Sequence, residues 1–219
     1  MKLSKRLLAI ANYINHEDKV VDVGCDHGYL DIYLALNKKN KMIIASDISP
    51  LVIKATQENI AKYNLEDKIK VYCTDGIKNI RENYDTLILS GLGAHTIIQI
   101  LAKDVKAKKI IIQSNNHWDM IRKHVVKMGF GLFSEKLIYE KKKLYSIMLF
   151  KKKKNHIMFQ EKLVGVYNEN NIEEYKIWLH IIQNILTSIP KKHFFKRLKY
   201  QKQLKYIKKY LAKKNRAVC

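Results

Sequence analysis

Short apolar segments alternate with amphipathic ones through the first 150 residues, and this alternation restricts the folds that the chain can adopt. The segments MIIA, LILS and IIIQ lack the alternating polar residues of a strand with one face in water, so each predicts a strand buried on both faces. Between such segments, apolar residues recur at three- and four-residue steps, as they do in helices. Strands that alternate with helices predict an α/β protein, in which helices cover both faces of a mostly parallel sheet.

Boundary residues support individual elements. Ser4 is the predicted N-cap of the first helix, and Ser49 caps another helix in which Pro50 takes the first helical position. The predicted helices cover residues 2–14, 27–38, 49–64, 95–104 and 117–129. The predicted strands cover residues 20–24, 41–47, 68–75, 84–93 and 107–116. Two further strands, 135–143 and 143–153, are close enough in sequence to form an antiparallel pair, which gives a seven-stranded sheet.

The sequence changes in character after the lysine run 151–154. Two long segments, 173–189 and 192–214, carry apolar residues at three- and four-residue steps and Lys or Arg on their other faces. Pro190 separates them. This pattern predicts an antiparallel helical hairpin of coiled-coil character. We therefore expect two domains, residues 1–153 with the sheet and residues 154–219 with the basic hairpin.

Positive charge is concentrated in the C-terminal part of the chain. Of the formal net charge of +22, residues 151–219 contribute +14, from 18 Lys and Arg against 4 Asp and Glu. This asymmetry favours a polyanionic partner, because binding to phosphates releases counterions. A lysine-rich composition would raise the surface charge in the same way, so charge alone does not decide for a nucleic acid.

The cysteines and the apolar runs bear on metal content and location. Cys25, Cys73 and Cys219 are widely spaced and form no CxxC motif, so we expect a reduced protein without a metal. The longest apolar runs are shorter than the roughly 20 residues that span a bilayer. The first residues do not have the pattern of a secretory signal. We expect a cytoplasmic monomer with no membrane partner.

Small or polar residues follow every predicted parallel strand, at the edge where such sheets bind ligands. Strand by strand, this edge receives Asp22, Gly24, Asp26, His27 and Gly28; Asp47; Asp75 and Gly76; Ser90, Gly91 and Gly93; and Gln113, Ser114, Asn115 and Asn116. Agreement among five strands predicts a ligand site there.

The glycine-containing turn after the first strand discriminates among ligands. A dinucleotide-binding turn reads G-x-G-x-x-G, whereas Gly24 is followed here by Cys-Asp-His-Gly, with Asp26 in place of the middle glycine. A carboxylate there would repel a pyrophosphate and favour a cationic ligand. S-adenosylmethionine carries an ammonium and a sulfonium group and no phosphate, so we expect it as the cofactor and disfavour an NAD-dependent enzyme.

Several of these residues also have a purely structural explanation. Asp47 would cap the helix that begins at Pro50, Asp75 and Gly76 would form an ordinary turn, and His27 would only bond the start of a helix. Their common position at one edge favours the ligand site.

Longer stretches of the sequence resemble the TrmK family of bacterial tRNA (adenine-N1)-methyltransferases, which act on adenine 22 in the D-arm region. The matching stretches, in the family's order, are LSKRLLAIANYI, VVDVGCDHGYLDIYL, TDGI, SGLGAHTIIQIL, IIIQSNNHWDMIRKHVVKMGF and SEKLIYEKKKLYSIMLF. They cover about residues 1–150, and a basic helical hairpin is also the family's C-terminal architecture. The resemblance implies a class I, Rossmann-like methyltransferase domain, S-adenosyl-L-methionine as cofactor and tRNA as partner.

The resemblance also assigns roles. Asp26, His27 and Asn115 are the expected catalytic residues: Asp26 stabilises positive charge on the adenine, Asn115 bonds the edge of the base, and His27 orients Asp26 or contacts the base. The expected cofactor-binding residues are Asp22, Gly24, Asp26, Gly28, Asp47, Ile48, Asp75, Gly76 and Gly91. The expected substrate-binding residues are Gly93, Gln113, Asn115 and Asn116. The chain departs from the family pattern at Asp31, Leu92, Ala94 and Ser114.

Two alternatives remain open at this point. The protein is a methyltransferase for another RNA position or for a small molecule, or it is a non-catalytic RNA-binding protein with a vestigial cofactor pocket. Identification of the methylated product separates the first alternative from the main prediction, and cofactor binding separates the second.

Overall fold

Seven strands form one sheet in the computed structural model, which describes residues 1–153 and 157–216. The strand order is β3-β2-β1-β4-β5-β7-β6. The strands are β1 (Lys19–Val23), β2 (Met42–Asp47), β3 (Ile69–Cys73), β4 (Thr86–Ser90), β5 (Lys109–Ser114), β6 (Phe130–Glu140) and β7 (Lys143–Lys152). Pairing is parallel from β3 to β5, and β7 pairs antiparallel with β5 and β6. The predicted seven-stranded, mostly parallel sheet is confirmed.

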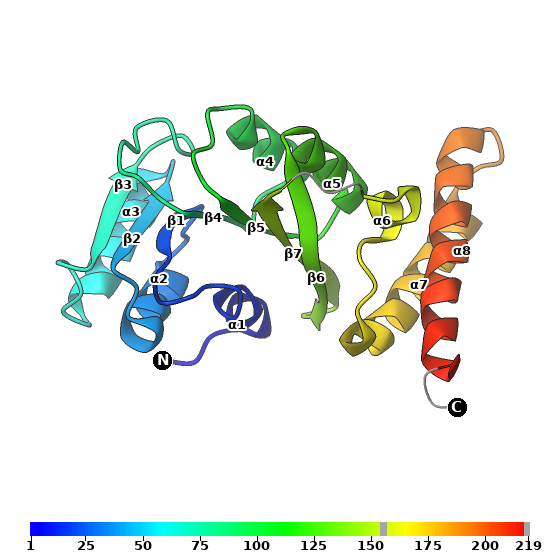
Figure 1. Cartoon of the computed structure of the whole chain (residues 1–219), viewed down its shortest axis with the longest axis horizontal. Coiled ribbons are helices and arrows are strands. Elements are labelled where there is room, and N and C mark those ends of the chain that lie inside the picture. The colour runs from blue at the N-terminus through cyan, green and yellow to red at the C-terminus, as the bar shows by residue number, and fades with distance from the viewer. Residues whose placement is uncertain (154–156, 217–219) are drawn as a thin grey trace.

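Helices cover both faces of the sheet, as Figure 1 shows. One face packs against α1 (Lys5–Ala11), α2 (Tyr29–Tyr33) with its π-helical continuation Leu34–Lys38, and α3 (Pro50–Ala61). The other face packs against α4 (Ala94–Leu101) and α5 (Trp118–Lys127). The central strands β1, β2, β4 and β5 contribute buried residues to both apolar layers, which explains their lack of polar alternation.

The predicted helix caps are present. The Ser4 hydroxyl accepts a hydrogen bond from the Leu7 N–H at 3.3 Å, and the Ser49 hydroxyl accepts one from the Val52 N–H at 3.5 Å. Pro50 is the first residue of α3. These local signals fix the starts of α1 and α3 without help from the rest of the fold.

The C-terminal part contains α6 (Phe159–Val164), a 3-10 turn (Glu169–Asn171), α7 (Ile172–Ser188) and α8 (Phe194–Arg216). The helices α7 and α8 form the predicted antiparallel hairpin. The Tyr175 and Tyr210 rings lie 5.4 Å apart, while near the connecting turn Arg197 donates to the carbonyl of Ile189 at 2.6 Å. The hairpin stands at the β6 end of the sheet (Figure 1). The helix α6 was not predicted.

A third apolar cluster joins the hairpin to the sheet domain. The Trp118 ring of α5 meets the Trp178 ring of α7 edge-on, with centroids 4.8 Å apart. The Asn171 side chain accepts a hydrogen bond from the Leu137 N–H of β6 at 3.1 Å. Both parts therefore share a core. The predicted domain boundary, after residue 153, adjoins residues 154–156, which lie outside the described part of the chain.

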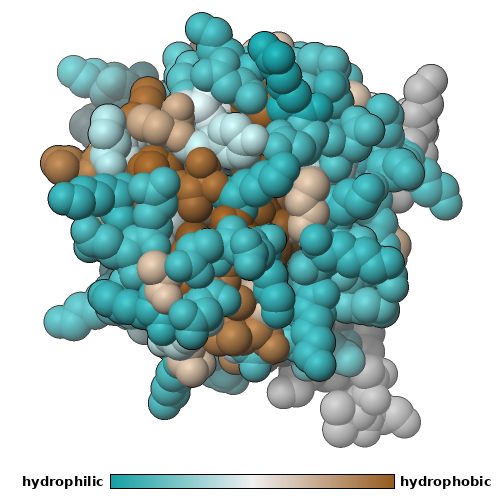
Figure 2. Space-filling view, turned by 90° about the vertical axis from the view of Figure 1, so that its left-hand side faces the viewer, coloured by the Kyte–Doolittle hydropathy of each residue, from teal (hydrophilic) through white to brown (hydrophobic). Residues whose placement is uncertain are grey.

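The opposite end of the molecule is the edge strand β3. Figure 2 shows this end, where hydrophobic residues reach the surface among hydrophilic ones. A groove between α3 and β3 is lined there by Ile60, Ile69 and Val71. Among residues 1–153 and 157–216, no helix is long and apolar enough to cross a membrane.

Candidate active site

The register of the parallel strands brings the predicted residues to one edge. Val23, at the end of β1, lies beside Ser46 of β2 and Leu89 of β4. Ser90, at the end of β4, lies beside Gln113 of β5. The loops after these strands therefore begin side by side, as the sequence predicted.

The turn after β1 is fixed by its main chain. The N–H groups of Gly24 and Cys25 donate to the Ser46 carbonyl at 2.8 and 3.1 Å. Gly24 and Gly28 have φ angles of 76° and 72°, which side chains disfavour. A Cβ atom at Gly28 would lie 2.8 Å from Cγ2 of Thr56. Glycine at position 28 thus allows α3 to pack directly against the turn.

Asp26 and His27 occupy the exposed crest of this turn. The Thr56 hydroxyl donates to the Asp26 carbonyl at 2.8 Å, and the Asn59 amide donates to the His27 carbonyl at 3.0 Å. The side chains are 78% and 47% exposed, and Nε2 of His27 lies 3.5 Å from Oδ1 of Asp26. The helix α3 therefore holds the backbone of the crest, while both functional groups remain free to meet a ligand.

Two more carboxyl groups lie inside the protein near the turn, on Asp22 of β1 and Asp31 of α2. Burial, and secondarily the charge of Asp47, raises the pKa of Asp22 to about 7. Burial and the charge of Asp22 raise the pKa of Asp31 well above its usual value. Among the described residues, Oδ1 of Asp22 and both carboxyl oxygens of Asp31 have no hydrogen-bond partner. A cationic ligand bound here would favour the ionised form of these carboxyl groups.

These raised pKa values predict a loss of stability between pH 4 and pH 7. Aspartates of the unfolded chain ionise near pH 3.8, whereas folded Asp22 retains its proton to about pH 7. Between these values the folded state binds more protons, so the free energy of unfolding falls as the pH rises. Asp31→Asn removes one of the two acids. We expect it to be nearly neutral at pH 4 and stabilising by at least about 1 kcal/mol at pH 7.

Urea unfolding of both proteins across this pH range measures the difference. Asp67→Asn makes the same chemical change at an exposed position before β3 and serves as the matched control. A difference between Asp31→Asn and the wild type that stays constant from pH 4 to pH 7 would contradict the prediction.

Asp47 is the last residue of β2, and Ile48 follows it. Oδ1 of Asp47 accepts a hydrogen bond from the Ser49 N–H at 2.9 Å, so this oxygen helps to shape the turn before α3. Asp47 is half-buried and Ile48 is 69% exposed. Both the structural explanation and the predicted contact with the cofactor are compatible with this arrangement, since the second carboxylate oxygen of Asp47 has no hydrogen bond within the described ranges.

Asp75 and Gly76 follow β3. Nζ of Lys103 lies 2.9 Å from Oδ2 of Asp75 and donates to the Asp75 carbonyl as well. Gly76 has a φ of 64°, and a Cβ atom there would lie 3.0 Å from Cγ1 of Ile100. The turn is thus closely packed against α4. The predicted contact of Asp75 with the cofactor would compete with its ion pair to Lys103.

The ends of β4 and β5 hold the remaining predicted residues. Gly91 has a φ of 76°, with open space where a Cβ atom would be, and Gly93 precedes α4. Gln113, a predicted substrate-binding residue, is buried, and its side-chain oxygen accepts hydrogen bonds from Arg6 at 2.7 Å and from Ser90 at 3.0 Å. Gln113 therefore ties α1 to the sheet edge, and its contact with a substrate stays a prediction.

Asn115 and Asn116 are exposed in the loop between β5 and α5, where we expected them. Within the described part of the chain their side chains form no hydrogen bond. They are available to bind a base edge, which needs both donors and acceptors.

Sequence reasoning missed the residues that support the site. Thr56 and Asn59 hold the crest of the turn from α3, Lys103 holds Asp75, and Arg6 holds Gln113. The apolar pattern of α3 indicated a helix but not its contact with the turn. Arg6 lies 107 positions from Gln113, so no local signal connects the two.

The donor set fits S-adenosylmethionine. The buried Asp22 oxygen without a partner and the acidic crest at Asp26 suit a ligand with cationic groups and would repel a pyrophosphate. Among the described residues, no three His, Cys, Asp or Glu side chains gather as metal ligands. Cys219 lies outside the described residues.

Comparisons with known proteins agree with this geometry. A family model described as a methyltransferase domain matches residues 3–148. The chain is 32% identical over 154 residues to a tRNA (adenine(22)-N(1))-methyltransferase of Bacillus subtilis. That alignment covers 68% of this chain and spans 65% of the length of the relative.

Solved structures extend the similarity to the C-terminal part. The M. capricolum TrmK structure in complex with S-adenosyl-homocysteine superimposes with a TM-score of 0.83 at 29% identity, covering 97% of this chain and 99% of that one. A Streptococcus agalactiae protein of the NADB-Rossmann superfamily gives a TM-score of 0.84 at 27% identity, covering 96% and 98% of the two chains. The chain therefore belongs to the methyltransferase-domain family and, within it, to the TrmK family.

Proposed function

We propose that this protein transfers a methyl group from S-adenosylmethionine to N1 of adenine 22 in tRNA. The observation that carries the proposal is the acidic crest between Gly24 and Gly28, which has the Asp-His pair of the family in a turn that the rest of the fold holds in place. The description of the Bacillus subtilis relative names this activity, and the M. capricolum TrmK structure holds the cofactor product S-adenosyl-homocysteine.

The residues of the chain divide between the two ligands. Asp22, Gly24 and Gly28 lie at the end of β1 and in the turn after it, where the carboxyl group of Asp22 would ionise beside the cationic part of the cofactor. The other proposed cofactor-binding residues are Asp26, Asp47, Ile48, Asp75, Gly76 and Gly91. Asn115, Asn116 and Gly93 stand at the ends of β5 and β4 and would receive the adenine.

The proposed reaction needs no general base. The cofactor supplies a methyl group on a sulfonium: the bond from carbon to sulfur breaks, the bond from carbon to N1 forms, and the positive charge passes from sulfur to the adenine. N1 attacks with an in-plane lone pair, so no proton has to be removed first. Asp26 would stabilise the charge that appears on the base, and Asn115 would bond its edge. Because N1 lies on the pairing edge, the adenine must leave its stack.

The decisive experiment supplies labelled S-adenosylmethionine and an unmodified tRNA transcript. Nucleoside analysis should find 1-methyladenosine, and replacement of adenine 22 by guanine should abolish it. Methylation of another position or of a small molecule only would support the first alternative. Calorimetry with S-adenosylmethionine addresses the second, since absence of binding would indicate an RNA-binding protein with a vestigial pocket.

We propose that the hairpin binds the phosphate backbone of tRNA. In this proposal residues 1–153 contain the catalytic site, and residues 154–219 carry half of the net positive charge. Lys196, Lys205 and Lys208 are exposed on α8. We expect their joint replacement by alanine to weaken tRNA affinity about 10-fold or more at low salt and to reduce the salt dependence of binding by up to about one unit of slope per lysine. Cofactor affinity should not change.

Lys54, Lys68 and Lys108 provide the matched control. These three lysines are also exposed, and they lie in residues 1–153, away from the hairpin. Their replacement by alanine removes the same total charge. Titrations of labelled tRNA at several salt concentrations compare the two triple variants. Equal losses in both would show that total charge, and not the hairpin, governs binding.

We further propose that the enzyme acts as a monomer in the cytoplasm. The phosphate backbone of tRNA is the kind of polyanion that the basic hairpin suits. Sedimentation of the protein with and without tRNA tests the monomer.

A further inference from the structure

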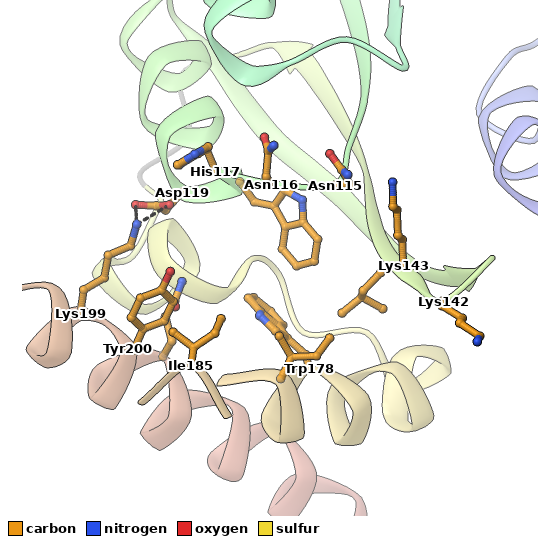
Figure 3. Close-up of a pocket in the computed structure, with 14 residues that line it drawn as sticks. Asn115, Asn116, His117, Asp119, Lys142, Lys143, Trp178, Ile185, Lys199 and Tyr200 are labelled. Carbon is orange, nitrogen blue, oxygen red and sulfur yellow. Dashed lines mark hydrogen bonds and ion pairs between the residues drawn. The ribbon is translucent and has the colours of Figure 1, made fainter. Parts of the chain in front are cut away.

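A cavity opens beside the candidate active site, between the loop from β5 to α5 and the hairpin. Its volume is about 410 Å³, within the range of small-molecule sites. Figure 3 shows Asn115 and Asn116 above it and Trp178, Ile185 and Tyr200 below it. The cavity therefore has one wall from each part of the chain.

The walls combine flat apolar surface with unpaired polar groups. Trp178 and Ile185 of α7 and Tyr200 of α8 form an aromatic and aliphatic floor. The side-chain amides of Asn115 and Asn116 lie at the rim on exposed residues, and no hydrogen bond within the described residues engages these side chains. A nucleobase needs both features, a surface on which to stack and donors and acceptors for its edge.

The two ends of the cavity differ in charge. At one end Lys199 and Asp119 form an ion pair with Nζ 2.8 Å from Oδ2. At the other end stand Lys142, in the tight turn between β6 and β7, and Lys143, the first residue of β7 (Figure 3). No ion pair among the described residues engages these two lysines, so this end is free to receive a phosphate. Positive charge at one end and stacking surface in the centre match the shape of a nucleotide.

The cavity and the candidate active site share Asn115. This residue follows β5, next to the end of β4 where Gly91 and Gly93 lie. An RNA strand that places its target adenine at the end of β4 would pass its neighbouring nucleotide over the rim formed by Asn115 and Asn116. The geometry thus connects two adjacent positions on one strand.

We propose that this cavity binds a second unpaired nucleotide of the RNA substrate, a neighbour of the methylated adenine, with its base against Tyr200 and Trp178 and its phosphate at Lys142 and Lys143. This inference rests on the proposed function. It assigns to the hairpin a part in recognising an unfolded stretch of RNA, in addition to holding the phosphate backbone.

Tyr200→Ala tests the stacking surface. Base stacking on an aromatic side chain contributes enough that its loss should weaken tRNA binding about 10-fold, seen as a higher KM for tRNA. The affinity for S-adenosylmethionine and the apparent melting temperature should change little. Tyr206→Ala is the matched control, because Tyr206 lies on α8, is also half-buried and does not line the cavity.

A direct readout uses tRNA transcripts with 2-aminopurine next to the target adenine, on the 5′ side in one and on the 3′ side in the other. Wild-type enzyme should quench the fluorescence of one of them on binding, Tyr206→Ala should do the same, and Tyr200→Ala should not. Lys143→Glu should weaken the quenching without touching the floor of the cavity.

The outcomes separate the two proposals. If wild-type enzyme produces 1-methyladenosine but neither fluorophore responds, or if Tyr200→Ala and Tyr206→Ala behave alike, the second nucleotide site is wrong and the proposed function stands. If wild-type enzyme methylates no adenosine in tRNA, the proposed function falls and this inference falls with it.

Discussion

Asp26→Asn is expected to lower kcat for tRNA methylation about 100-fold while leaving the affinity for tRNA nearly unchanged. The reaction places a positive charge on the adenine ring, and Asp26 is the exposed carboxylate at the crest of the turn beside the cofactor end of β1. A carboxylate that meets a charge only as it develops stabilises the transition state more than the bound substrate. Its loss therefore appears in kcat and not in KM.

Asparagine is chosen so that the substitution removes the charge of Asp26 without straining the backbone of the turn. Asp26 has a φ of 54°, in the left-handed region that asparagine and glycine tolerate better than other residues. Asp26→Ala would also lose the charge, with added strain in the turn. Asp26→Gly relieves the strain, so equal losses in the asparagine and glycine variants would assign the effect to the carboxylate.

His27→Gln separates the two members of the pair. If His27 only orients Asp26, the glutamine variant should lose less than the Asp26→Asn variant, and the double variant should lose no more than Asp26→Asn alone. Single-turnover rates at saturating tRNA measure all of these. Asp26→Asn with a wild-type single-turnover rate would remove Asp26 from the catalytic residues.

The elements of the fold could be predicted because their signals are local. Unbroken apolar strands, the Ser49 cap with Pro50, and the three- and four-residue steps of the C-terminal segments are all present in short windows of sequence. The short helix α6 was missed, since six residues carry too little periodicity to be distinguished from a loop. The order of the strands in the sheet was not predicted, because pairing between strands distant in sequence has no local signature.

The candidate site was predictable at the level of position but not of contact. Residues that end parallel strands must gather at one edge, so Asp26, Asp47 and Asn115 were found from spacing alone. Gln113 shows the limit of this reasoning: it ends β5 like its neighbours, yet Arg6 and Ser90 hold it inside the protein. The sequence showed Asp31 only as a departure from the family pattern and gave no sign of its environment. In the structure its carboxyl group is buried and interacts with that of Asp22.

Arg122→Met is expected to lower the free energy of unfolding by about 3–5 kcal/mol, a large part of the total for a typical domain. Arg122 is fully buried, and its guanidinium lies 3.0 and 2.5 Å from the two carboxylate oxygens of Glu135, which is 2% exposed. Methionine fills similar volume but leaves this carboxylate without its cation. An unpaired buried charge is far more costly than a missing hydrogen bond.

This pair also connects the sheet domain to the hairpin. Arg122 belongs to α5 and Glu135 to β6, while the Glu135 carbonyl accepts hydrogen bonds from Asn168 at 3.1 Å and Asn171 at 3.2 Å. A Cβ atom at Gly165 would lie 2.6 Å from Cδ of Glu135, so Gly165→Ala should destabilise the same centre with both charges intact. Loss of the pair should therefore loosen the position of the hairpin as well.

A compensated variant distinguishes the unpaired charge from lost packing. Replacing Arg122 by Met and Glu135 by Leu removes both charges, and Ser146→Ala removes the hydroxyl that donates to Glu135 at 2.5 Å. Apolar replacements of a whole buried ion pair are often neutral or stabilising, so the triple variant should recover most of the loss. Urea unfolding with unchanged m-values compares the variants. A triple variant as unstable as Arg122→Met alone would show that shape, and not charge, sets the stability of this centre.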